Sequence, residues 1–256
     1  MKAFLMIGQS NMAGRGALND LPELSSAHVW MLRQDEWTEA REPVTLDKPQ
    51  LAGAGLGLTF GIAVNMLTGE DVGLIPASLG GTGLDAWMPE CDLYEEAVRR
   101  AVRAMNSGAV LSGVLWHQGE NDSKYFDKAF TYTKRLRRMM QALTDRLNQE
   151  AERMEDKTRI LSPLPVLVGE LGDYLDDNAS SLYHRAVNEQ LHAFAALRPE
   201  YACVQASDLP DKGDALHFST LSQRRLGLRY ANAWFDTFIS QQRQDVYRAM
   251  QHTDYI

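Results

Sequence analysis

The chain has 256 residues, of which 45% are hydrophobic and 23% charged, a balance that is typical of a globular protein and excludes a largely disordered one. Its formal net charge is −8 and its basic residues are scattered, so we expect no nucleic acid and no membrane as a partner. No apolar run reaches the roughly 18 residues of a membrane span. Cys91 and Cys203 lie far apart without CxxC spacing, which suits a reduced compartment better than a disulfide framework. Because the first apolar run is also too short for a signal peptide, we expect a cytoplasmic protein.

Five short apolar runs predict β-strands, and longer segments between them predict helices because their apolar residues recur every three or four positions. The strands are expected at residues 3–7, 72–77, 110–117, 165–170 and 201–206, and the helices at residues 93–105, 125–155, 180–197 and 219–239. Continuous apolar strands suit a parallel sheet that helices cover on both faces. The sequence therefore predicts an α/β fold, a three-layer α/β/α sandwich with about five parallel strands.

We expect a single domain over residues 1–240, because one core can grow to roughly 250 residues before chains tend to split. The segment from Pro22 to Pro49 is polar and irregular, which indicates a long surface excursion rather than a second domain. Residues 241–256 are polar as well, and they are expected to form a C-terminal tail that frays or joins an interface.

Polar residues follow the first predicted strand at once, in the stretch GQSNMAG at residues 8–14. A serine in such a place is either a nucleophile at a sheet edge or the cap of the next helix. Three other strands are followed by suggestive sequences, which are SLGGTGLDAW after the second, QGEND after the third and DALHFS after the fifth. Ligands of open parallel sheets bind beyond the carboxyl ends of the strands, so we expect a site at this edge.

These residues include the parts of a serine esterase. Acyl transfer needs a hydroxyl, an imidazole that takes its proton and an acid that holds the imidazole. Ser10 is the candidate nucleophile and His217 the candidate general base. Asp214 lies three residues before His217 and is the candidate orienting acid. Gln9 is expected to support the turn that carries Ser10.

The oxyanion hole is expected to use the backbone N–H groups of Ser10 and Gly81 and one side-chain amide. Gln118 and Asn121 are both candidates for that amide, and Gln118 is favoured because it directly follows the predicted strand. Trp87 comes after the glycine-rich turn. It is either a stacking platform for a sugar ring or a hydrophobic lid on the core.

Taken together and in this order, GQSNMAG, GLIPASLGGTGLDAW, WHQGEND and DALHFS resemble the sialate O-acetylesterase-like branch of the SGNH hydrolases, which includes acetylxylan esterases of carbohydrate esterase family six. The resemblance covers roughly residues 1–240. It implies a flavodoxin-like fold and deacetylation of a small carbohydrate through an acetyl-enzyme, with no metal and no cofactor. It also implies a triad that matches Ser10, Asp214 and His217, and a supporting role for Glu120, in the network or in orienting the base beside Asp214.

Two other functions remain open at this point. One is an SGNH esterase that acts on other short acyl groups, and the other is a non-catalytic carbohydrate-binding protein on the same scaffold. The identity of the acetylated sugar and the oligomeric state do not follow from the sequence, because specificity depends on loop shapes.

Overall fold

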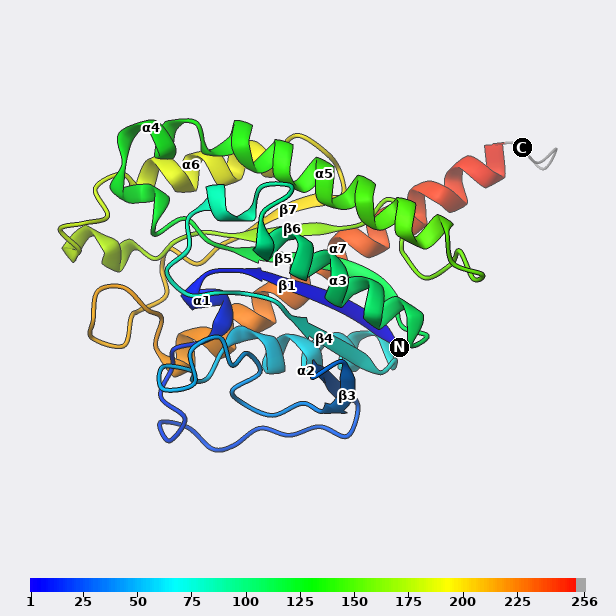
Figure 1. The fold of residues 1–256 in the computed structure, drawn as a ribbon, viewed down its shortest axis with the longest axis horizontal. Helices are drawn as coiled ribbons and strands as arrows, with labels where there is room; N and C mark the ends of the chain where they lie inside the picture. The colour runs from blue at the N-terminus through cyan, green and yellow to red at the C-terminus, as the bar shows by residue number, and fades with distance from the viewer. Residues whose placement is uncertain (252–256) are drawn as a thin grey trace.

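In residues 1–251, which the computed structural model describes, a seven-stranded β-sheet carries helices on both of its faces (Figure 1). Side chains are described up to residue 238. Across the sheet, the strands are β3 (Glu36–Glu39), β2 (Val29–Arg33), β4 (Val72–Pro76), β1 (Lys2–Gly8), β5 (Val110–His117), β6 (Val166–Gly169) and β7 (Tyr201–Val204). All neighbours are parallel except β2 and β3. The predicted α/β fold with a mostly parallel sheet is therefore confirmed.

The described chain has seven strands rather than about five, and the two additional ones lie in the segment that we expected to be a surface excursion. Strand β2 pairs in parallel with β4, and β3 pairs with β2 in antiparallel fashion at the edge of the sheet. The turn between them places Gln34 and Asp35 at φ values of 51° and 63°. Such a two-residue turn usually contains glycine or asparagine, so this hairpin lacks the signal by which it would be recognised.

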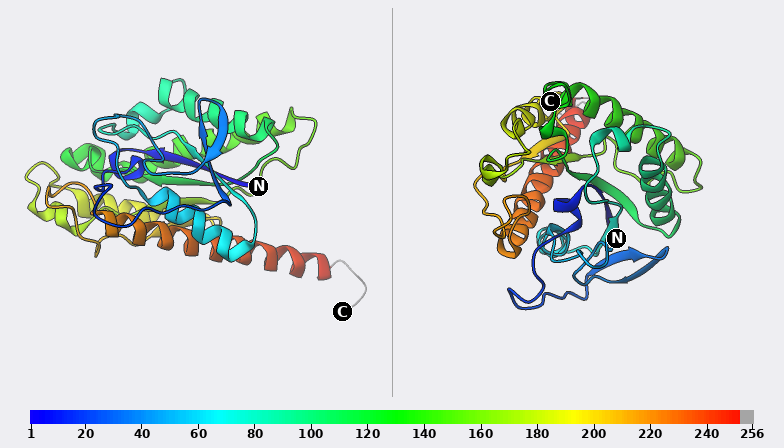
Figure 2. Two further views of the ribbon diagram at one scale, coloured as in Figure 1. Left: turned by 90° about the horizontal axis from the view of Figure 1, so that it is seen from below. Right: turned by 60° about the vertical axis from the view of Figure 1, so that its left-hand side comes forward.

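Helices α3 (Asp92–Asn106), α5 (Tyr132–Glu152) and α6 (His184–Ala195) cover one face of the sheet, and α2 (Leu56–Thr68) and α7 (Thr220–Gln251) cover the other (Figure 2). Strand β1 supplies both cores, because alternate side chains of a strand point to opposite faces. Ala3, Leu5 and Ile7 pack beneath the first group of helices, whereas Phe4 and Met6 pack beneath the second. This double burial explains the continuous apolar run of β1.

Several boundaries differ from those expected. The predicted helix at 125–155 is divided into α4 (Phe126–Phe130) and α5. Helix α7 continues beyond residue 239 to Gln251, so the first part of the expected tail is helical, and residues 252–256 lie outside the described residues. None of the described helices is both long and apolar enough to cross a membrane.

The remaining short elements gather at the carboxyl ends of the strands, on the left of Figure 1. They are α1 (Ser10–Ala13) and the 3-10 helices η1 (Leu84–Trp87), η2 (Asp122–Lys124) and η3 (Asp173–Asp177). The loops after β1, β4 and β5 and the loop before α7 therefore meet at this edge of the sheet.

Candidate active site

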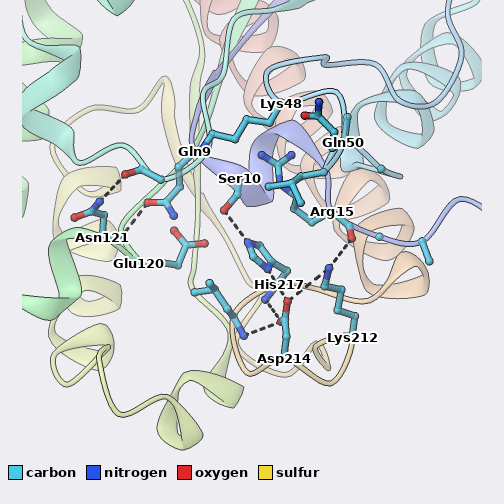
Figure 3. Close-up of a pocket in the computed structure, with 18 of the residues that line it drawn as sticks. Gln9, Ser10, Arg15, Lys48, Gln50, Glu120, Asn121, Lys212, Asp214 and His217 are labelled. Atoms are coloured by element: carbon cyan, nitrogen blue, oxygen red, sulfur yellow. Dashed lines mark hydrogen bonds and ion pairs between the residues drawn. The ribbon is translucent and has the colours of Figure 1, made fainter.

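An open pocket of about 670 Å³ lies at the carboxyl edge of the sheet. Its lining includes Ser10 after β1, Gly81 after β4, Asn121 after β5 and His217 before α7 (Figure 3). The four loops that the sequence singled out thus contribute to one cavity.

The backbone at the end of β1 presents Ser10 to this pocket. Gly8 has a φ of 134°, and a Cβ atom there would come within 2.2 Å of the carbonyl oxygen of His117. The N–H of Gln9 then donates to that oxygen at 3.0 Å, and α1 begins at Ser10. The Ser10 side chain does not cap the helix, whose N-cap is Gln9 without a side-chain hydrogen bond. The helix-cap interpretation of Ser10 is therefore wrong.

Ser10, His217 and Asp214 form a continuous chain of hydrogen bonds (Figure 3). The Ser10 Oγ lies 3.1 Å from His217 Nε2, and His217 Nδ1 lies 2.7 Å from Asp214 Oδ2. Asp214 Oδ1 also accepts the backbone N–H of His217 at 2.8 Å. The Asp-x-x-His spacing thus lets one carboxylate hold both the ring and the backbone of the histidine.

The protonation states of this chain suit proton transfer from Ser10. Burial lowers the pKa of His217 below its usual value of 6.5, although Asp214 works in the opposite direction. Burial would raise the pKa of Asp214, but hydrogen bonds from His217 outweigh it and lower the pKa. At neutral pH the imidazole is therefore free to accept a proton and the carboxylate is ionised.

Asn11 connects α1, the helix that carries the candidate nucleophile Ser10, to the backbone on both sides of His217, and sequence reasoning missed this role. It is fully buried. Its Nδ2 donates to the carbonyl of Leu216 at 3.1 Å, and its Oδ1 accepts the N–H of Phe218 at 3.2 Å. The only sequence signal is its position next to Ser10, because Leu216 and Phe218 lie more than 200 residues away.

Glu120 lies beneath the pocket and accepts a hydrogen bond from the side-chain amide of Asn11. Its side chain is 1% exposed, and this burial raises its pKa to about 7 despite the hydrogen bond. Among the described residues, the ring of His217 bonds to Asp214 and Ser10 and not to Glu120. Glu120 thus joins the hydrogen-bond network through Asn11 and does not contact the ring that Asp214 holds.

Two backbone donors are available for an oxyanion. Within residues 1–251, no hydrogen bond uses the N–H of Ser10 or that of Gly81, and both residues line the pocket. Asn121 also borders the pocket, and its Nδ2 donates to the carbonyl of Gly81 at 2.7 Å. One N–H of that amide stays available, because an amide nitrogen carries two hydrogens.

Our prediction that Gln118 is the side-chain donor of the oxyanion hole is wrong, because its amide group is fully buried and already hydrogen-bonded. Its Nε2 donates to Gln9 Oε1 at 3.1 Å and to Asp122 Oδ2 at 2.8 Å. Its Oε1 accepts the hydroxyl of Tyr132 at 2.6 Å. Gln118 thus supports the side chain of Gln9, and Asn121 is the amide that reaches the pocket.

Trp87 cannot stack on a sugar, because its side chain is 1% exposed. Its ring packs edge-on against Trp116, with centroids 5.7 Å apart, and its Nε1 donates to Thr82 Oγ1 at 3.1 Å. The helix η1 turns this side chain inward beneath the glycine-rich loop. Trp87 is the hydrophobic lid of the two alternatives.

The pocket is rich in cations although the protein is acidic overall. Arg15, Lys48, Lys124 and Lys212 all line it. Lys212 pairs with Asp214, whereas no salt bridge within the described side chains involves Lys48 or Lys124. Two ammonium groups are thus free to meet an anionic ligand. Within the same residues, no group of three His, Cys, Asp or Glu side chains is placed to hold a metal ion.

The chain is similar in sequence to known carbohydrate esterases. Residues 1–236 match the family model described as carbohydrate esterase, sialic acid-specific acetylesterase. The chain is 30% identical to a probable carbohydrate esterase of Arabidopsis thaliana, over 92% of this chain and 90% of that protein. The crystal structure of that plant protein aligns with a TM-score of 0.80 at 28% identity, over 92% of this chain and 98% of the other.

Two more distant solved structures share the fold. NanS aligns with a TM-score of 0.75 at 15% identity, over 93% of this chain and 97% of that chain. A carbohydrate acetylesterase from Xanthomonas citri aligns with a TM-score of 0.62 at 18% identity, over 90% of this chain and 55% of that chain. At these identities the likeness concerns the fold alone.

Proposed function

Since the chain belongs to the carbohydrate esterase, sialic acid-specific acetylesterase family, we propose that it removes O-acetyl groups from a sugar by serine catalysis. The observation that carries this proposal is the hydrogen-bonded chain of Ser10, His217 and Asp214 inside an open pocket. Its geometry is that of a nucleophile, a base within reach of it and an acid that orients the base.

In the proposed reaction, Ser10 Oγ attacks the acetyl carbonyl while His217 Nε2 takes its proton. Asp214 holds the other ring nitrogen and stabilises the imidazolium. The oxyanion accepts hydrogen bonds from the N–H groups of Ser10 and Gly81 and from the amide of Asn121. When the intermediate collapses, the bond to the sugar oxygen breaks and His217 returns the proton to that oxygen.

The acetyl-enzyme is then hydrolysed by the same residues. His217 takes a proton from a water molecule, and the resulting hydroxide attacks the acetyl carbon. Collapse breaks the bond to Ser10 Oγ, which regains its proton from His217, and acetate leaves. These steps require no metal ion and no organic cofactor.

The charge of the pocket favours an acidic sugar over a neutral xylan fragment. Lys48 and Lys124 border the pocket without a salt bridge among the described side chains. A carboxylate on the substrate would pair with such an ammonium group, whereas a neutral sugar leaves both to water. An O-acetylated sialic acid carries that carboxylate and is the substrate class that we propose.

The test compares Ser10→Ala with Ser112→Ala, a buried serine of β5 that lies outside the pocket. Acetate release from acetylated sialic acid and from an aryl acetate is measured for both. We expect Ser10→Ala to lose at least about 10³-fold in kcat/KM and Ser112→Ala to stay near wild type. Near-wild-type activity of Ser10→Ala would refute serine catalysis.

Two further measurements separate the alternative functions. A series of acyl chains from acetyl to octanoyl identifies a general short-chain esterase if the longer esters react as fast as the acetate. A fluorophosphonate that labels Ser10 excludes a purely carbohydrate-binding protein, whereas sugar binding without labelling or acetate release would favour one.

A further inference from the structure

A buried ion pair joins Arg15 to Asp47 next to the nucleophile helix. The side chains are 4% and 1% exposed. Arg15 Nη1 lies 3.1 Å from Asp47 Oδ1, and Arg15 Nη2 lies 2.6 Å from Asp47 Oδ2. Removing two charges from water carries a large desolvation cost, so such a pair adds little to stability compared with apolar side chains of similar size. Its place beside the active site points instead to a role in function.

Asp47 has a second partner in the glycine-rich loop after β4. Its Oδ2 accepts the backbone N–H of Gly80 at 2.7 Å. Gly80 directly precedes Gly81, whose N–H is a proposed oxyanion donor. The side chain of Asp47 therefore determines the direction of the peptide group that comes immediately before this donor.

The close packing around Gly80 leaves this loop little freedom. A Cβ atom on Gly80 would come within 2.4 Å of Arg15 Nη2, 3.0 Å of Asp47 Oδ2 and 3.4 Å of Ser10 Cβ. The next residue, Gly81, has a φ of 83°, which favours glycine. Glycine is thus needed at the two positions of the SLGG sequence for different reasons. At residue 80 a side chain would collide with the ion pair, and at residue 81 the backbone conformation favours glycine.

Arg15 ties the same assembly to the nucleophile helix. Its Nη1 also donates to the carbonyl of Gly14 at 2.8 Å, directly after α1. Three segments that are distant in sequence are thereby connected, namely α1, the loop after β3 and the loop after β4. The connection runs from the helix that carries Ser10 to the peptide beside Gly81.

We propose that Asp47, held in place by Arg15, is a positioning residue for the oxyanion hole. By accepting the N–H of Gly80, it keeps the N–H of Gly81 directed at the position that the substrate oxyanion takes beside Ser10. The effect appears in the transition state, because the oxyanion exists only there. This inference rests on the proposed serine mechanism.

The test uses Asp47→Leu, which removes the acceptor, and Asp47→Asn, which keeps an acceptor oxygen for Gly80. Active sites are counted with a fluorophosphonate, so that kcat refers to folded enzyme. For Asp47→Leu we expect kcat to fall about 10- to 100-fold with KM within about 2-fold, as for a displaced oxyanion donor. Asp47→Asn should recover kcat to within about 5-fold of wild type.

A second readout addresses the oxyanion hole itself. A phenylboronic acid forms a tetrahedral adduct with a reactive serine and places an oxygen in the hole. Its affinity should fall in Asp47→Leu by about the same factor as kcat/KM, and the Asp47→Asn variant should recover it. Should Asp47→Leu not fold, the boronate affinity of Asp47→Asn is still compared with that of wild type. The double variant Arg15→Met, Asp47→Leu is measured as well. If its kcat and boronate affinity equal those of wild type, the proposal is overturned.

The matched control is Glu42, which forms another largely buried ion pair with Arg224. It lies in the same segment of the chain and does not line the pocket. Glu42→Gln and Glu42→Met should lower thermal stability without changing kcat per labelled site. Unchanged kcat and boronate affinity in folded Asp47→Leu would show that the Arg15–Asp47 pair is purely structural. Failure of the serine mechanism is recognised separately, by activity that survives Ser10→Ala.

Discussion

Replacement of Asn11 by alanine separates the positioning of His217, the proposed general base, from the chemistry of that base. In the wild-type protein, the Asn11 side chain bonds to Leu216 and Phe218 on the two sides of His217. Asn11→Ala removes both bonds, and the bond from Asn11 to Glu120 as well, but leaves Ser10, His217 and Asp214 unchanged. The loop that carries His217 is then joined to α1 through the contact between His217 and Ser10, without the two backbone bonds that hold it there.

The size of the effect follows from what stays unpaired. The N–H of Phe218, a fully buried residue, loses its acceptor, which costs about 1–3 kcal/mol. The carbonyl of Leu216 keeps the hydroxyl of Tyr174 at 3.3 Å and contributes less. The buried carboxyl of Glu120 also loses its hydrogen bond from Asn11, which adds to the cost. We therefore expect the free energy of unfolding to fall by about 2–3 kcal/mol. A shift of His217 by about 1 Å would lower kcat on the order of 10²-fold.

The assay combines urea unfolding with kcat per fluorophosphonate-labelled site. Asn188→Ala is the matched control, because Asn188 bridges the backbone N–H and C=O of Leu171 at 2.8 and 2.9 Å, outside the pocket. It should lose similar stability and keep its kcat. Equal kcat in Asn11→Ala and Asn188→Ala would refute the reasoning, because Asn11 would then be a structural bridge like any other.

Three further predictions concern the charges of the site. Because the neutral form of His217 is the proposed base, kcat/KM should rise with pH through a pKa below 6.5. Asp214→Asn removes a group that raises this pKa, so it should move this rise in kcat/KM to lower pH and cut kcat about 10⁴-fold. A rise that stays at the same pH in Asp214→Asn would contradict the assignment. The folded-state pKa of Glu120 is about 7, above its usual 4.5, so its ionisation costs wild-type stability as pH rises between these values. Glu120→Gln should therefore gain up to about 3 kcal/mol relative to wild type between pH 4 and pH 8 in urea unfolding, whereas a constant difference would argue against a buried titrating carboxyl. Lys124→Ala should raise KM about 2- to 5-fold for acetylated sialic acid and leave KM for an aryl acetate unchanged. Lys134→Ala on α5 is the control. An equal rise in KM for both esters would argue against a carboxylate on the substrate.

Most strands were predictable because their burial leaves a local pattern in the sequence, although β2 was missed despite its apolar residues. Strand β1 is apolar throughout because helices cover both of its faces, and the sequence shows this directly. Strand β3 was missed because its residues are mostly exposed and it exists only by pairing with β2 at the sheet edge. When a strand forms mainly because it pairs with a neighbouring strand, its own sequence shows little β-strand pattern.

The candidate site divides in the same way. Asp214 and His217 are three residues apart, so their contact follows from a local turn that the sequence displays. Gln118 directly follows β5, which suggested the pocket, but its amide turns inward to Tyr132 and Asp122. The direction of a side chain at a strand end depends on partners elsewhere in the chain, and adjacency to a strand does not reveal it.

The stretch from Ser10 to Arg15 organises the site because its side chains point in different directions. Successive residues of α1 are about 100° apart, and Arg15 follows after the helix has ended at Ala13. Ser10 faces His217, Asn11 faces the backbone around His217, and Arg15 reaches Asp47 and thereby the oxyanion loop. Helix α1 carries the first two of these side chains, and Arg15 follows directly after its C-cap, Gly14. The relative positions of nucleophile, base and oxyanion donors therefore depend on the length of this one segment.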